Sequence, residues 1–178
     1  MKDSLTIIEY LTKSNSDTIM IGLKCLYQII YVLSKIRGVK TLIKFFPSDV
    51  FIFETIILFL VKLDLEDTEN WCLIYTLILW TSVLSLVPFD VDTIDSNNNI
   101  IITLLNYYKN GLGVSGIIRD MTSYAIAKFI TRPDIIKKGL LSNFFDWSIS
   151  VLSDKNPNLF LILGKIKKIK GRYLGCFV

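Results

Sequence analysis

Two pairs of opposite charges stand out among the residues of this 178-residue chain that could do chemistry. Arg119 and Asp120 lie near the start of the stretch IRDMTSYAIAKFITRPD, and Arg132 and Asp134 lie at its end. No nucleophile in this stretch is paired with a base, so we expect no covalent catalysis there. The charges suit a structural role, in which Asp120 fixes Arg132 or a neighbouring helix end, or alternatively contact with a partner. Asp90, at the start of an acidic loop, is a further candidate of the same kind.

The absence of histidine removes many mechanisms from consideration. A Ser-His-Asp triad, a Cys-His dyad, a histidine-ligated zinc site and a histidine general base are all excluded. The three cysteines, Cys25, Cys72 and Cys176, are far apart in sequence and form no C-x-x-C motif. An odd number of scattered cysteines predicts reduced, mostly buried thiols in a cytosolic chain.

Two loops have the composition of ligand-binding motifs but lack their context. The stretch GLGVSG (111–116) fits G-x-G-x-x-G and precedes a helix. A dinucleotide site needs a strand before it within a βαβ unit, whereas the preceding LLNYYKN has helical periodicity, so we predict a turn between helices. The stretch DVDTIDSNNN is rich in oxygen ligands, but an EF-hand would need glycine and glutamate where Asp95 and Ile101 stand. We therefore expect no cofactor and no metal.

Basic residues alternate with apolar ones in KIKKIKGRY (165–173), near the C-terminus. Such a stretch could contact acidic lipid, RNA or an acidic protein surface, although the solvated end of a helix is the simpler interpretation. No aromatic stacking platform accompanies it, so we expect no nucleic acid partner. The block from Leu63 to Tyr108, by contrast, holds seven acidic residues and no lysine or arginine.

The stretch WCLIYTLILWTSVLSLVPF (71–89) runs nineteen residues without a charge. A helix of this length would reach about 28 Å, close to the thickness of the hydrocarbon core of a bilayer. Its flanks are acidic, however, and offer no nearby lysine or arginine that would orient a membrane span. Thr81, Ser82 and Ser85 would also form a narrow polar seam on such a helix. We therefore predict a buried helix and no membrane span, and a small membrane protein spanning at 71–89 is the alternative.

Helical periodicity extends over nearly the whole chain. Capping residues, glycines and prolines predict helices over the ranges 17–38, 49–63, 69–88, 97–110, 115–131 and 133–152. Successive helix pairs repeat with a loose period of about forty residues or slightly more, as in HEAT and armadillo arrays. We therefore predict an all-α HEAT/armadillo-like α-solenoid of antiparallel helix pairs. A non-repetitive helical bundle is the alternative from the pattern alone.

Three stretches of the chain carry the motifs of a known family. The first is IRGVKTLIKFFPSDV, with the motif residues Arg37, Gly38, Lys40, Phe46 and Pro47. The second is WCLIYTLILWTSVLSLVPFDVDTID, with Trp71, Tyr75, Leu77, Leu79, Trp80, Ser82, Pro88, Phe89 and Asp90. The third contains Arg119, Asp120 and Ala125, then FITRPD (129–134) and FDWS (145–148). In this order and spacing, about residues 35–152 resemble the N-terminal part of the tubulin-folding cofactor D family.

The resemblance implies an armadillo/HEAT-type solenoid in a cytoplasmic protein that receives β-tubulin after the chaperonin. Members of the family act with tubulin cofactors C and E and an ARF-like small GTPase to assemble or take apart the αβ-tubulin dimer. The cofactor complex stimulates GTP hydrolysis by tubulin. The resemblance thus implies a chaperone and not an enzyme, with β-tubulin as its partner and with association to microtubules.

The chain is expected to comprise two regions. Residues 1–152 would form the helical repeats, and residues 153–178 a divergent basic C-terminal segment that matches the family poorly. Members of the family are several-fold longer, so the resemblance implies a segment of such a protein or a reduced relative. A generic HEAT adaptor for transport or for another GTPase is a further alternative.

Overall fold

The computed structural model describes residues 17–89 and 99–153, and every structural statement below concerns these residues. They contain helices and no strand. Backbone contacts divide the chain into two units, residues 1–46 and 47–178. Each unit is described by itself.

The first unit contains one long helix, α2 (Asp17–Ile36), followed by the short α3 (Val39–Leu42) and the 3₁₀ turn η1 (Ile43–Phe45). Gly38 separates α2 from α3 with a φ of 79°, a backbone conformation that glycine adopts without steric cost. Its carbonyl oxygen accepts hydrogen bonds from the backbone N–H groups of Thr41 and Leu42, both at 3.2 Å. The prediction of a helix from residue 17 that ends at Gly38 is confirmed.

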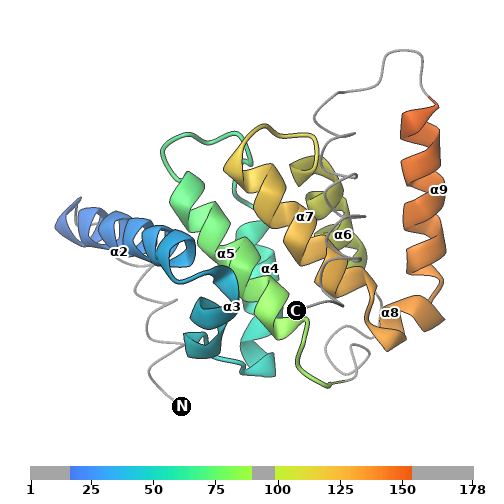
Figure 1. The fold of residues 1–178 in the computed structure, drawn as a ribbon, viewed down its shortest axis with the longest axis horizontal. Coiled ribbons are helices and arrows are strands. Elements are labelled where there is room, and N and C mark those ends of the chain that lie inside the picture. The colour runs from blue at the N-terminus through green and yellow to red at the C-terminus, as the bar shows by residue number, and fades with distance from the viewer. Residues whose placement is uncertain (1–16, 90–98, 154–178) are drawn as a thin grey trace. The chain divides into compact units, whose positions relative to one another are not determined.

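The second unit is built from helix pairs (Figure 1). Its elements are η2 (Val50–Ile52), α4 (Phe53–Leu60), α5 (Trp71–Leu84), α6 (Asn99–Gly111), α7 (Ile117–Ile130), α8 (Pro133–Lys137) and α9 (Leu140–Leu152). Helices α5 and α7 pack side by side in one layer, and α4 and α6 pack against each other behind them. The connections 61–70 and 112–116 therefore lie at the same edge of the stack, where they line one hollow.

Short polar side chains define where the pairs begin. Asp49 accepts a hydrogen bond from the backbone N–H of Phe51 at 3.0 Å and so caps η2. Asp67 accepts from the N–H groups of Glu69 and Asn70, at 2.8 and 3.1 Å, just before α5. Helix α5 thus begins at Trp71, two residues after the predicted start, because the carboxylate of Asp67 holds the preceding backbone in a turn.

Helix α5 is the inner helix that its sequence predicts. It spans fourteen residues, of which eleven are buried, and the buried residues lie on all sides of the helix. Since the helix ends at Leu84, it covers only part of the uncharged stretch 71–89. No helix in the described part of the chain is long and apolar enough to cross a membrane. The alternative of a span at 71–89 therefore finds no support.

The hydroxyl groups of the predicted polar seam are buried along α5. Thr81 donates to the carbonyl oxygen of Ile78 at 2.8 Å, and Ser82 donates to that of Leu79 at 2.6 Å. Ser85 donates to the carbonyl oxygen of Thr81 at 2.7 Å. Because each hydroxyl donates a hydrogen bond to a backbone carbonyl oxygen of α5 itself, these side chains can lie in the core without an unsatisfied donor.

Tyr108 of α6 joins the two layers. Its hydroxyl donates to the Oγ1 atom of Thr81 at 2.7 Å, and its ring meets that of Phe129 of α7 edge to face, 6.1 Å between centroids. Burial raises the pKa of Tyr108, so the hydroxyl stays protonated and remains a donor. One side chain therefore holds α5, α6 and α7 together.

The predicted helix 133–152 is two helices. Gly139 adopts a left-handed conformation with a φ of 71°, which ends α8 and starts α9. Its N–H donates to the carbonyl oxygen of Ile136 at 3.0 Å, as at the C-terminal end of a helix. The prediction of one continuous helix was wrong, because a glycine that follows lysines in the last turn of a helix is itself a signal that the helix ends.

A close approach of α6 and α7 gives a first testable prediction. A Cβ atom on Gly111 would lie 2.8 Å from Oγ1 and 3.0 Å from Cγ2 of Thr122, which is fully buried. We expect Gly111→Ala to lower the free energy of unfolding by about 1–3 kcal/mol through overpacking. Gly22→Ala in α2 is the matched control, since nothing lies within 4 Å of the added atom. There we expect a gain of about 0.5–1 kcal/mol in helix stability. Thermal unfolding followed by circular dichroism measures both, and an unchanged or higher melting temperature for Gly111→Ala contradicts the prediction.

Candidate functional site

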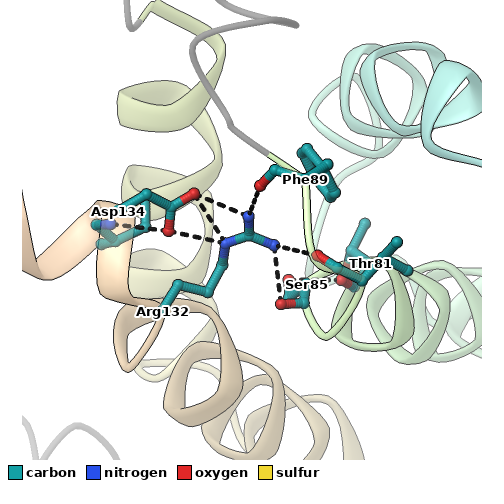
Figure 2. Close-up of polar contacts among 7 residues, drawn as sticks. Thr81, Ser85, Phe89, Arg132 and Asp134 are labelled. Carbon is teal, nitrogen blue, oxygen red and sulfur yellow. Dashed lines mark hydrogen bonds and ion pairs between the residues drawn. The ribbon is translucent and has the colours of Figure 1, made fainter.

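Arg132 and Asp134 come together at the junction of α7 and α8 (Figure 2). Arg132 precedes Pro133, which disfavours helical backbone at the residue before it, and its φ and ψ of −63° and 140° are extended. The side chain therefore leaves the axis of α7 and crosses to the residues that follow α5.

The guanidinium group of Arg132 donates hydrogen bonds to three carbonyl oxygens in the turn that follows α5. Nη1 donates to the carbonyl oxygens of Ser85 and Val87, at 2.9 and 3.2 Å, and Nη2 donates to that of Phe89 at 2.7 Å. The last carbonyl groups of a helix have no partner within the helix and carry partial negative charge. A buried arginine thus satisfies the end of α5 and fixes the turn 85–89.

Asp134 neutralises this guanidinium group. Its carboxylate accepts from Nε of Arg132 at 3.0 Å and from Nη2 at 2.8 Å, and it also accepts from the backbone N–H of Ile135 at 2.9 Å. The guanidinium carbon lies 4.4 Å from the centroid of the Phe89 ring, which adds a cation–π contact. Arg132 is only 8% exposed, and this number of partners is what a buried charge requires.

An open hollow of about 640 Å³ lies beside this cluster. Its walls are the turn 85–89 on one side and Pro133, Lys137 and Lys138 on the other. Through its hydrogen bonds the cluster joins the turn after α5 to the start of α8.

The other predicted candidates lie elsewhere. Arg119 and Asp120 are in the first turn of α7, at the opposite end from Arg132, and Nε of Arg119 lies 3.5 Å from Oδ1 of Asp120. The partner of Arg132 is thus Asp134, and Asp120 pairs with its neighbour in its own helix. Asp90 lies outside the described residues, as does the rest of the acidic loop.

The hollow beside GLGVSG is unsuited to a phosphate. Gly113, Val114 and Ser115 line it from one side, and Glu66 and Asp67 line it from the other. Two carboxylates would repel the negative charge of a nucleotide. The stretch forms the predicted turn between α6 and α7.

Helix α2 carries a wide exposed apolar face that sequence reasoning missed. Its members are Ile21, Leu26, Ile29, Val32, Leu33 and Ile36. The sequence shows one apolar series, Ile19, Leu23, Leu26, Ile30 and Leu33, at three- and four-residue steps. Within this series Leu26 and Leu33 are exposed, whereas Leu23 and Ile30 are half-buried. The signal available in the sequence was that α2 is apolar over most of its circumference. We call this set the α2 face.

The sequence that contains the α2 face is basic. Residues 18–48 contain five cations, Lys24, Lys35, Arg37, Lys40 and Lys44, and no acidic residue. Cys25 is exposed on the same helix, so the prediction of mostly buried thiols holds for Cys72 and is wrong for Cys25. Cys176 lies outside the described residues.

Comparison with known proteins gives one family. Residues 3–152 match the family model described as tubulin-specific chaperone D-like, ARM repeat. No solved structure matches the chain. The match and the stacked helix pairs confirm the prediction of an all-α armadillo-type solenoid.

Proposed function

Because this chain belongs to the tubulin-specific chaperone D-like family, with a role related to tubulin folding, we propose that it binds β-tubulin. It would do so in the cytoplasm or at microtubules, together with tubulin cofactors C and E and an ARF-like small GTPase. The proposed outcome is assembly or disassembly of the αβ-tubulin dimer. GTP hydrolysis would belong to tubulin and be promoted by the assembly, so this chain would act as a binding protein.

The observation that carries the proposal is the α2 face. Ile29 and Val32 are 53% and 49% exposed, within a continuous series of apolar side chains on one helix. A large exposed apolar patch on a folded protein marks a site of interaction, and a partly assembled tubulin subunit would bury it. Differential binding of folding intermediates requires no reactive side chain on the chaperone.

The test is a pull-down of β-tubulin released from the chaperonin, with the full chain as bait. We expect Ile29→Glu with Val32→Glu to weaken binding by at least about tenfold, since central apolar contacts dominate interface energetics. Both residues are about half exposed, so unfolding should change little. Leu58→Glu in α4, also 49% exposed, is the matched control and should bind like the wild type.

Two results would contradict this proposal. Failure of the wild-type chain to retain β-tubulin at micromolar concentration would remove the function. Retention by the double variant equal to the wild type would remove the α2 face as the binding surface. Retention of the ARF-like GTPase without β-tubulin would instead favour the generic adaptor.

A further inference from the structure

A groove runs along the edge of the stack where the loops 61–70 and 112–116 meet. Two adjoining hollows form it, of about 810 and about 690 Å³. They share Leu65 and Glu66 from the first loop and Gly113 and Val114 from the second. Because both hollows have these residues in common, they form one continuous surface.

The groove combines an apolar floor with an acidic rim. Trp71 and Ile118 contribute to one hollow, and Trp147 and Val151 to the other. Three carboxylates, of Asp64, Glu66 and Asp67, line the two hollows against one cation, Lys109. The ammonium group of Lys109 lies over the ring of Trp147, 5.2 Å from its centroid.

Two of the carboxylates are held in place by their own loop. Asp64 accepts from the N–H of Glu66 at 3.1 Å, and Asp67 accepts from the side-chain amide of Asn70 at 2.7 Å. Burial together with the negative charge of Asp64 raises the pKa of Tyr107, whose hydroxyl donates to the carbonyl oxygen of Leu63 at 3.3 Å. The negative field of the rim is therefore fixed in position before any occupant binds.

The chain itself contains a segment with the complementary pattern. Residues 165–172, KIKKIKGR, hold five cations and two isoleucines. Helix α9 borders the groove through Trp147 and Val151, which lie in the last two turns of the helix. Lys165 follows Ser153 by twelve residues, which span up to about 40 Å when extended. The segment can therefore reach the whole groove of its own chain.

We propose that residues 165–172 bind in this groove of the same chain, with the lysines on the acidic rim and the isoleucines on the apolar floor. The short connection gives the segment an effective concentration that a separate basic partner does not have. The bound segment also covers Leu65 and Val114, which are otherwise half-exposed. The groove thereby accepts an external basic segment only when this one is released. This inference does not depend on binding to β-tubulin.

Zero-length carbodiimide cross-linking of the full chain, followed by mass spectrometry, tests the proposal. We expect amide links between lysines of 165–170 and the carboxylates of Asp64 and Glu66, because this reagent joins only groups in contact. Raising the salt concentration to 1 M shortens the Debye length to about 3 Å, and the yield should fall several-fold. Mixing isotope-labelled with unlabelled chain shows whether the links are within one chain.

Charge reversal makes the test specific. Lys167→Glu with Lys168→Glu should reduce the links to the rim at least tenfold. Adding Asp64→Lys with Glu66→Lys should restore the links, with the carboxylates now on the segment and the amines on the rim. Glu54→Lys, an exposed acid on α4 outside the groove, is the control and should leave the links unchanged. Equal yields to Glu54 and Glu66 in the wild type, or links only between chains, would overturn the proposal. Links from the segment to added anionic vesicle lipid, in place of the rim, would overturn it as well.

Discussion

Replacement of Arg132 by leucine is expected to lower the free energy of unfolding by about 3–5 kcal/mol. The variant leaves the partly buried carboxylate of Asp134 without its partner, and it removes the Arg132 donors to the carbonyl oxygens of Ser85, Val87 and Phe89, just after α5. The loss is largest at the carbonyl oxygen of Ser85, whose bond to Nη1 is buried, because water does not replace the missing donor there. For a chain of this size we expect a fall in melting temperature of roughly 10 °C, measured by calorimetry or circular dichroism.

Two variants separate charge from geometry at this position. Arg132→Lys keeps the positive charge but has one nitrogen in place of the planar fork, so it should recover only part of the loss. Asp134→Asn removes the carboxylate and leaves the carbonyl contacts of Arg132, and we expect a smaller effect than for Arg132→Leu. If Arg132→Leu unfolds within about 1 kcal/mol of the wild type, the cluster does not hold α5 to α8.

Truncation of Phe129 to alanine should also cost about 3–5 kcal/mol. The side chain is fully buried, and its ring contacts that of Tyr108, which in turn bonds to Thr81 of α5. The cavity left by the ring would lie where α5, α6 and α7 meet, so neighbouring helices cannot close it without shifting. Urea unfolding monitored by tryptophan fluorescence measures the change.

Two control variants accompany Phe129→Ala, one that removes an exposed phenylalanine ring and one that keeps an apolar side chain at position 129. Phe51→Ala removes a ring that is 89% exposed, and we expect a change within about 0.5 kcal/mol. Phe129→Leu keeps most of the apolar volume and should cost about 1–1.5 kcal/mol. Equal effects of Phe129→Ala and Phe51→Ala would contradict the assignment of Phe129 to the core.

Much of the fold could be predicted from local patterns. Gly38 ends a helix and Pro133 begins one, because their backbone preferences are properties of the residue and need no distant contact. The burial of α5 also followed from its sequence, since a helix that is apolar on all sides must be surrounded. The break at Gly139 belongs to the same class of signal, and its neighbours Lys137 and Lys138 marked it.

The candidate sites depended on tertiary structure. Residue types indicated that Arg132 is paired, but only the fold distinguishes Asp134 from Asp120 as its partner. The exposed α2 face was hidden for a related reason: periodicity shows that a helix is apolar, and packing decides which of its sides is covered.

The sequence by itself determined the helical class of this protein, the helix boundaries at Gly38 and Pro133, and the family of its motifs. Each of these rests on neighbours within a few residues, or on the order of short stretches along the chain. The tertiary structure alone decided that Arg132 closes the end of α5, through hydrogen bonds to residues forty-three to forty-seven positions earlier. The physical reason is that a buried charge is stabilised by whatever polar groups the packing of helices brings within reach, and no local pattern encodes that meeting.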